Sequence, residues 1–274
     1  MVPEPVIASP LAGPGLWMET LLGLAYPPVC ALCHERRAGP REGHVCGLCR
    51  LGVRTITEPC CQRCGTPFGG EIIGAHTCTA CRSGSPSWDE ARAAVVAEGV
   101  VLECIHRLKY QREPWFATFL SGLLAEAAAP RLAGHRWEGL VPVPLHPVRR
   151  REREFNQAEL LARPLATALG LPLRTDLVRR REPTLSQASL SRDERIRNMR
   201  SAFEPAHGGR IRGAWIVVDD VLTTGATTDG VATVLKTLGA TRVVVWAVAR
   251  ATLESAGSGW AGPDQSARRS SDHT

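Results

Sequence analysis

The chain has 274 residues, which is enough for one sizeable core and a smaller appended domain. Its composition, 44% hydrophobic and 22% charged, is that of a globular protein and excludes the disordered and fibrous classes. The 33 basic and 27 acidic residues give a net charge of +6, which permits an anionic partner without requiring one.

The N-terminal segment carries no targeting pattern. No lysine or arginine precedes Arg36, so the basic start of a signal peptide is missing. No apolar run in the chain approaches the ~20 residues that a membrane span needs. We therefore expect a cytoplasmic protein, at most peripheral to a membrane, in which residues 1–24 form an N-terminal extension.

The cysteines are concentrated in one region, because nine of the ten lie between Cys30 and Cys81. Eight of them form C-x2-C pairs in two similar, consecutive units. Each pair places two thiolates on a tight turn, and two such turns supply the four sulfur ligands that Zn²⁺ favours. A disulfide framework is the alternative, but nothing indicates secretion, and regular C-x2-C pairs suit a metal better. The predicted zinc ligands are Cys30, Cys33, Cys46, Cys49, Cys61, Cys64, Cys78 and Cys81.

Segment 25–85, which contains these pairs, is short and poor in aliphatic residues, so metal ligation should supply much of its folding free energy. We predict a double zinc ribbon with two structural Zn²⁺, and leave open which pairs share a site. Cys60 is interpreted as an unused neighbour, and Cys104 as a small core residue in an apolar helical pattern. Three nearby histidines are left out of the ligand set: His34, His44 and His76.

A linker at 82–88 leads into an alternation of apolar strands and helical patterns. We expect strands at 91–99, 139–145, 214–218 and 242–249, and helices at 100–109, 113–130, 155–170 and 226–239. Pro130 is expected to end the second of these helices. Fully apolar strands separated by helices indicate a parallel sheet covered on both faces, which binds ligands at the carboxyl ends of its strands. The α/β domain should cover 88–252, and residues 253–274 have the composition of a disordered tail.

Two adjacent acids, Asp219 and Asp220, follow the apolar strand 214–218. The next residues supply hydroxyls around a glycine at the start of a helix, an arrangement that suits a phosphate group. We call this segment the phosphate loop: Thr223, Thr224, Gly225, Ala226 and Thr227. A sugar 5′-phosphate would place its phosphate on the loop and its 2′ and 3′ hydroxyls on the carboxylates, which would also help to hold Mg²⁺. The alternative is a strand–turn–helix with threonine caps and no ligand.

The segment "VVDDVLTTGAT" at 217–227 resembles the phosphoribosyl pyrophosphate signature of type I phosphoribosyltransferases. It is not a Walker loop, because no lysine follows the glycine, nor a G-x-G-x-x-G fingerprint. Together with the cysteine pairs, three further segments resemble the ComF family of competence protein F relatives: "LKY" at 108–110, "VPVPLHPVRRREREFNQAELLA" at 141–162 and "LSQASLSRDERIRNMRSAF" at 185–203. The resemblance implies a type I phosphoribosyltransferase-like parallel sheet flanked by helices, preceded by a small zinc-ribbon domain.

The resemblance also implies roles for individual residues. Lys109 falls where the pyrophosphate loop would lie, and Asp219 and Asp220 match the acids that bind ribose and Mg²⁺. The phosphate loop matches the segment that binds the 5′-phosphate. A basic run in the flexible segment over the site could meet pyrophosphate: Arg149, Arg150, Arg151 and Arg153. The alternatives are a solvated helix face for the arginines and an ordinary surface position for Lys109.

Two residues depart from the family pattern. Glu154 stands where R-G-F-N-Q is usual, so a bulky acid replaces glycine, and Ala226 stands where many active phosphoribosyltransferases have glycine. The reaction that the resemblance implies is displacement of pyrophosphate at the anomeric carbon, supported by Mg²⁺ and cations on the leaving group. The incoming nucleophile is not identified by any residue.

The expected function combines two classes. The ComF resemblance implies binding of phosphoribosyl pyrophosphate and Mg²⁺, and a role in DNA uptake during natural transformation with single-stranded DNA and a DNA-uptake helicase as partners. The alternative is an active phosphoribosyltransferase in nucleotide salvage or metabolism without a DNA role. Arginine-rich stretches and tandem ribbons favour the first reading, and the intact phosphate loop favours the second.

Overall fold

The computed structural model describes residues 28–70, 74, 76–181 and 202–252. The expected N-terminal extension at 1–24, the tail at 253–274 and most of the motif at 185–203 lie outside the described residues.

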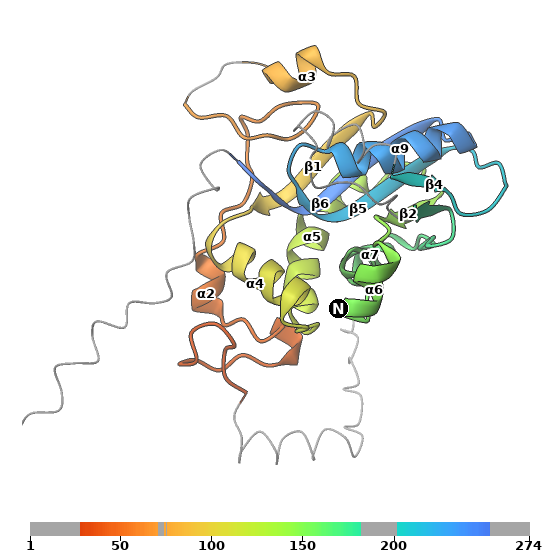
Figure 1. Ribbon diagram of the computed structural model, residues 1–274. Coiled ribbons are helices and arrows are strands. Elements are labelled where there is room, and N and C mark those ends of the chain that lie inside the picture. The colour runs from red at the N-terminus through yellow and green to blue at the C-terminus, as the bar shows by residue number, and fades with distance from the viewer. Residues whose placement is uncertain (1–27, 71–73, 75, 182–201, 253–274) are drawn as a thin grey trace, which may run out of the picture.

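The centre of the fold is a parallel sheet with the strand order β1-β6-β5-β2 (Figure 1). Its strands are β1 (Glu90–Val96), β2 (Gly139–Pro142), β5 (Ala214–Leu222) and β6 (Arg242–Arg250). The two longest strands are apolar along most of their length, as expected for strands covered on both faces. A short antiparallel hairpin, β3 (Val178–Arg180) with β4 (Phe203–Pro205), lies apart from this sheet.

Helices cover both faces of the sheet. The helices of the domain are α4 (Gly99–Tyr110), α5 (Phe116–Leu132), α6 (Pro147–Arg153), α7 (Gln157–Leu169) and α9 (Ala226–Leu238). Buried residues of α4, α5 and α7 form one core cluster with Ile216 and Val218 of β5. Those of α9 form a second cluster with Val217, because neighbouring strand residues point to opposite faces. The predicted fold class, a parallel sheet flanked by helices with N-terminal ribbons, is confirmed.

Several predicted boundaries differ from the structure, and three of these differences have a plain physical cause. Pro130 lies inside α5 and does not end it, because a proline in the last turn removes only one hydrogen bond while Leu132 beyond it is buried. β2 ends at Pro142, since the prolines that follow lack the N–H of a ladder residue. β5 continues past Val218, so both acids belong to the strand.

The two ribbons pack against different faces of the sheet. The first ribbon, residues 28–51 with η1 (Pro40–Glu42) and α2 (Gly47–Leu51), joins the core cluster of α4 and α5. The second, residues 58–83 with α3 (Thr79–Ser83), joins the cluster of α9. Figure 1 shows α2 to the left of α4, whereas α3 lies at the top, above β1 and α9. The segment between them runs along β1, where Ile56 N donates to Ala94 O at 3.2 Å.

Within the part of the chain that the structure describes, no helix has both the length and the apolar character needed to cross a bilayer.

Candidate ligand site and metal centres

The cysteines gather in two sets of four, and within each set all sulfur atoms lie within 4.8 Å of one another. The first set is Cys30, Cys33, Cys46 and Cys49, and the second is Cys61, Cys64, Cys78 and Cys81. Each sequence unit therefore makes its own site, which answers the pairing that the spacing left open. Cys60 and the histidines His34, His44 and His76 belong to neither set.

The geometry of the sulfur atoms fits zinc. The Sγ atoms of Cys33 and Cys46 are 3.7 Å apart, as are those of Cys64 and Cys78. A tetrahedron with Zn–S bonds of about 2.3 Å has sulfur–sulfur edges of about 3.8 Å, whereas a disulfide would need ~2.05 Å. Burial opposes ionisation of the Cys61 thiol, but backbone N–H groups directed at its sulfur outweigh burial and lower its pKa to about 6. The second set is thus prepared to supply a thiolate near neutral pH.

The acid pair lies near the carboxyl end of β5, where both side chains are buried. Asp219 continues the face of Val217 and Asp220 that of Val218, and the two carboxyl groups are close enough for the charge of Asp220 to act on Asp219. Asp220 N donates to Asp219 Oδ1 at 2.9 Å, and Val221 N donates to Asp220 Oδ1 at 2.7 Å. Each carboxylate is therefore oriented by a backbone N–H group.

Lys109, in the last turn of α4, forms an ion pair with Asp220 at 2.7 Å between Nζ and Oδ2. The lysine side chain is 19% exposed and the aspartate side chain 6%, so this is a largely buried pair. Among the described residues, Asp220 Oδ2 receives no hydrogen bond of good geometry besides this ion pair. A buried carboxylate oxygen with remaining acceptor capacity fits a hydroxyl donor or a hard cation such as Mg²⁺.

Burial is the main cause that raises the pKa of Asp219, and the charge of Asp220 adds to it. The nearby Lys109 ammonium opposes this effect only in part, and the pKa of Asp219 rises to about 8. The carboxyl therefore holds a proton at neutral pH unless another positive charge arrives. A cation that binds here would displace this proton.

The phosphate loop joins β5 to α9. Gly225 is the N-cap of α9 with φ +79°, a left-handed conformation that favours glycine. Thr223 and Thr224 are exposed, and Thr227 is half-buried in the first helical turn. Ala226 N donates to Thr224 Oγ1 at 3.3 Å, which folds the loop over the helix start. Exposed hydroxyls beside the free N–H groups of a 13-residue helix form a suitable place for an anion.

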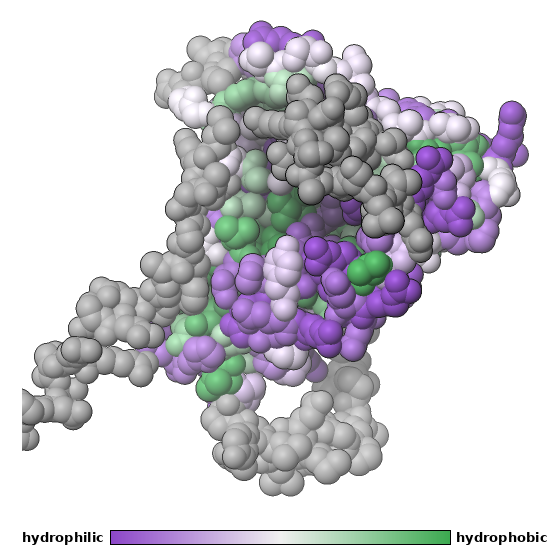
Figure 2. Space-filling model, in the orientation of Figure 1, coloured by the Kyte–Doolittle hydropathy of each residue, from purple (hydrophilic) through white to green (hydrophobic). Residues whose placement is uncertain are grey.

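The basic run, which we expected in a flexible segment, lies in helix α6, and its arginines have different neighbours. Arg149 pairs with Glu152, and Arg151 is exposed. Arg153 Cζ lies 5.2 Å from the centroid of the Tyr110 ring, next to Lys109 in sequence. Figure 2 shows hydrophilic residues gathered on the surface around α6.

Arg150 lines a cavity of about 540 Å³ that the β3–β4 hairpin also borders. The hairpin contributes Arg180, which the sequence did not single out. Arg180 lies over the Phe203 ring, and burial lowers the pKa of its guanidinium while the charge of Asp219 opposes this shift. The run of three arginines at 179–181 could have indicated a basic site, but a strand of three residues is too short to be recognised from its periodicity.

Glu154, the departure from the family pattern, caps α6 with φ 69°. This is the left-handed conformation that glycine adopts without strain, and an L-residue there costs roughly 1–2 kcal/mol. The observed geometry thus gives a physical reason for the usual glycine. The Glu154 side chain points to solvent, where it reaches Arg112 at 3.6 Å.

Comparisons with known proteins agree with this architecture. The model of the double zinc ribbon domain family matches residues 21–83. Competence protein F of Haemophilus influenzae is 32% identical over 233 residues, which cover 81% of this chain and 96% of that protein. The chain belongs to the ComF family.

Two other relatives extend this membership. The DNA utilization protein YhgH of Escherichia coli K12 is 32% identical to this chain over 233 residues, which cover 83% of this chain and 99% of YhgH. Competence protein ComFC of Bacillus subtilis is 26% identical over 67% of the chain and 74% of that protein.

Solved structures give a weaker likeness. Orotate phosphoribosyltransferase from Aeropyrum pernix is 22% identical, covering 51% of this chain and 72% of that one, with a TM-score of 0.29. UMP synthase of Leishmania donovani is 15% identical, covering 52% and 24%, with a TM-score of 0.28. The family membership therefore rests on the sequence relatives and not on these superpositions.

Proposed function

We propose that this ComF-family chain binds phosphoribosyl pyrophosphate together with Mg²⁺ at the carboxyl end of β5. The observation that carries the proposal is the convergence of the Asp219–Asp220 pair, Lys109 and the phosphate loop at one edge of the sheet. An acid pair suits the hydroxyls of a ribose, and the helix start suits its 5′-phosphate.

In this proposal each part of the chain has a separate task. The hydroxyls of Thr223 and Thr224 and the first N–H groups of α9 hold the 5′-phosphate. Asp219 and Asp220 accept the ribose hydroxyls and provide oxygen ligands for Mg²⁺, which supplies positive charge to the pyrophosphate group. Lys109 neutralises Asp220 in the free protein and is placed to meet the negative charge of the ligand. Arg150 and Arg153 add positive charge at the rim.

Calorimetry with Mg²⁺ and phosphoribosyl pyrophosphate tests the binding. Replacing both acids (Asp219→Asn with Asp220→Asn) should weaken binding by ~2–4 kcal/mol, because charge-assisted hydrogen bonds contribute roughly 1.5–3 kcal/mol each. The matched control is Asp176→Asn, an exposed acid paired with Arg174 away from the site, which should bind normally. An unchanged affinity in the double variant would remove the acid pair from the ligand site.

We propose DNA uptake during natural transformation as the process in which this binding operates. The support is the naming of two relatives as competence protein F and DNA utilization protein. Single-stranded DNA and a DNA-uptake helicase are the proposed partners. The logarithm of the DNA affinity should fall linearly with the logarithm of the salt concentration, with a slope of ~0.7 for each phosphate neutralised. Replacing Arg149, Arg150 and Arg151 by glutamine should flatten this slope by about two units.

Two outcomes would change this assignment. If removal of residues 1–85 abolishes DNA binding while the arginine changes leave it unaltered, the ribbons bind DNA instead. If no single-stranded DNA binds at low salt, with or without the helicase, the DNA role is wrong. The second candidate, a phosphoribosyltransferase in nucleotide salvage or metabolism, is favoured by the unbroken acid pair and phosphate loop. Release of pyrophosphate upon addition of candidate acceptors would decide for it.

A further inference from the structure

Arg250, the last residue of β6, joins the second zinc site to the sheet. Its guanidinium donates from Nη1 to Cys64 O at 3.0 Å and from Nη2 to Cys64 Sγ at 3.6 Å. The arginine is nine-tenths buried. In the sheet Arg250 is paired in register with Leu222, the residue that directly precedes the phosphate loop. The side chain of Arg250 thus contacts a predicted zinc ligand, while its backbone pairs with the strand that carries the loop.

Arg63 provides a second connection from the same turn of the ribbon. It lies between Cys61 and Cys64, and its guanidinium donates to the carbonyl oxygens of Gly84 at 3.2 Å and Pro86 at 3.3 Å. The guanidinium carbon also lies 5.8 Å from the centroid of the Trp88 ring. The same turn therefore orders the segment that leads from the ribbon into β1.

Trp88 and Ser87 carry this connection to the phosphate loop. Trp88 is buried and lies against Gly225, because a Cβ on the glycine would be in ordinary van der Waals contact with its ring, at 3.5 Å. Ser87 N donates to Asp229 Oδ1 at 2.5 Å, and the hydroxyls of Ser87 and Thr233 are 2.7 Å apart. Both partners of Ser87 lie on α9, the helix that begins at the loop.

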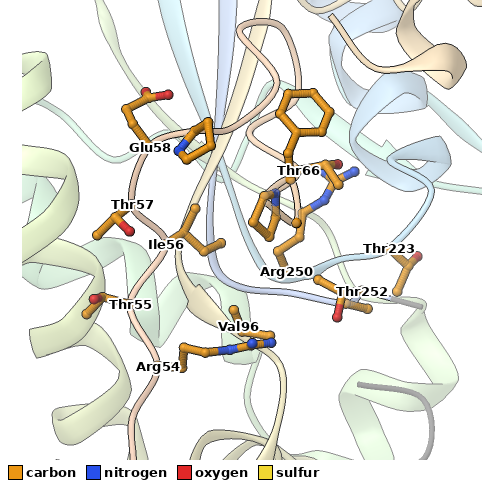
Figure 3. A pocket seen from close by; sticks show the side chains of 15 residues that line it. Arg54, Thr55, Ile56, Thr57, Glu58, Thr66, Val96, Thr223, Arg250 and Thr252 are labelled. Carbon is orange, nitrogen blue, oxygen red and sulfur yellow. The ribbon is translucent and has the colours of Figure 1, made fainter. Parts of the chain in front are cut away.

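The second ribbon and the phosphate loop also share a cavity. Thr66 of the ribbon, Arg250 and Thr223 of the loop line a space of about 680 Å³ (Figure 3). In Figure 3 Arg250 lies near the centre, below Thr66 of the ribbon, with Thr223 at the right and Ile56 and Thr57 at the left. A displacement of the ribbon would therefore remove one wall of the space beside the loop.

The first ribbon has different neighbours among the described residues. Arg107 of α4 donates to Ala31 O at 2.6 Å, and Arg50 pairs with Glu126 of α5 at 2.6 Å. A Cβ on Gly43 would stand 2.5 Å from Phe119 N, so this ribbon lies directly against α5. The contacts of the first zinc site thus lead to the helices and not to the phosphate loop.

We propose that the second zinc site is the structural support of the phosphate loop, with Arg63 and Arg250 as the positioning residues. Without zinc, no bonds hold the four sulfur atoms of the second set together, so the turn 61–64 loosens when the metal is lost. Arg250 then loses both of its acceptors, and a buried guanidinium without partners is strongly unfavourable. The end of β6 and the loop registered to it lose order as a result. The coupling between the second zinc site and the phosphate loop needs no ligand, and only its effect on ligand binding rests on the proposed function.

Amide hydrogen exchange of the full-length, zinc-loaded chain tests the proposal. In Cys61→Ser, amides within 222–230 should exchange about tenfold faster than in the wild-type chain, because local opening becomes easier. In Cys30→Ser, which removes the other site, their rate should not change. Unchanged exchange in α5 of Cys61→Ser would establish that the rest of the fold is intact. Equal loop exchange in both variants would overturn the proposal.

Arginine variants test the connection with both metal sites filled. Arg250→Lys keeps the positive charge but cannot donate to both Cys64 O and Cys64 Sγ as the guanidinium does. Arg63→Gln removes the guanidinium. Each should raise loop exchange several-fold, about three to ten times, while the zinc content stays at the wild-type value. Arg50→Gln is the matched control in the first ribbon and should leave the loop unchanged. If both arginine variants exchange like the control, Arg63 and Arg250 are not positioning residues.

Zinc affinity separates this proposal from the proposed function. Coupling between two sites is reciprocal in binding free energy, so phosphoribosyl pyrophosphate with Mg²⁺ should raise the zinc affinity of the second site only, as measured at equilibrium against a zinc-selective chelator. If calorimetry finds no binding of that ligand, the proposed function is wrong, and the exchange experiment on the free protein still decides the coupling. If the ligand binds but protects both zinc sites equally or neither, the coupling is wrong.

Discussion

Asp219→Asn should make the ligand-free protein more stable at alkaline pH. The pKa of Asp219 lies at about 8 instead of its ordinary 3.8, chiefly because the carboxyl is buried. A shift of one pKa unit corresponds to about 1.36 kcal/mol, so the ionised form destabilises the native state by on the order of 5 kcal/mol. The asparagine has no charge to bury and keeps the Oδ1 acceptor that Asp220 N uses at 2.9 Å.

The sign of the pH dependence follows from the direction of this shift. Between the ordinary pKa of 3.8 and about 8, the native state holds a proton that the unfolded chain has released. Stability of the wild-type chain therefore falls as pH rises through this window, and the full penalty is present above it. The variant should exceed the wild-type chain by about 2–4 kcal/mol at high pH, since an imperfectly bonded amide offsets part of the gain. The gain should shrink as pH falls and change sign near the lower pKa, where only the cost of the imperfectly bonded amide remains.

Urea unfolding followed by circular dichroism at several pH values between about 5 and 9 measures this difference, with zinc present throughout. The control is Asp176→Asn, because Arg174 lowers the pKa of that exposed carboxyl and its loss should slightly destabilise the protein. A gain that is the same at every pH, or an Asp219 variant that is less stable at the alkaline end, would refute the reasoning.

Three further predictions concern other parts of the molecule. Elemental analysis should find two Zn²⁺ in the wild-type chain and one in Cys30→Ser or Cys61→Ser, as the two cysteine sets indicate; metal-free protein with oxidised cysteines would contradict this. Glu154→Gly should raise the free energy of unfolding by about 1 kcal/mol by relieving the left-handed residue, whereas Glu152→Gly inside α6 should lower it by ~0.5–1 kcal/mol. Lys109→Met should destabilise the protein by ~3 kcal/mol by leaving Asp220 buried without its cation, and adding Asp220→Asn should restore most of the loss in the same urea assay.

The fold, and the acids and glycine near the carboxyl end of β5, could be predicted because each depends on a short stretch of sequence. C-x2-C spacing brings two sulfurs onto one turn wherever it occurs, and continuous apolar strands between helices have few packing solutions. The position of Asp219 at a strand end and the glycine of the phosphate loop follow from the same local pattern. These features needed no knowledge of distant contacts.

The remaining features depend on contacts between segments far apart in the sequence. Lys109 could be singled out, but its pairing with Asp220 requires the packing of α4 on β5. Nothing in the cysteine spacing indicates that the ribbons pack on opposite faces of the sheet, because that packing rests on buried contacts of each ribbon with a different core cluster. Arg180 lay in a strand too short to recognise from periodicity.

The contact between Cys64 and Arg250 also bears on how the protein is made. These residues are 186 positions apart, and β1 pairs with β6, which is the last strand of the described chain. A ribosome delivers the second ribbon early, when neither its arginine partner nor the neighbour of β1 has been synthesised. The cysteines can bind zinc at that stage, but the ribbon can dock only after residue 250 has emerged. A chain terminated before Arg250 would therefore expose both the ribbon and the edge of β1, which favours its proteolysis, and only a chain that includes β6 would assemble the phosphate loop.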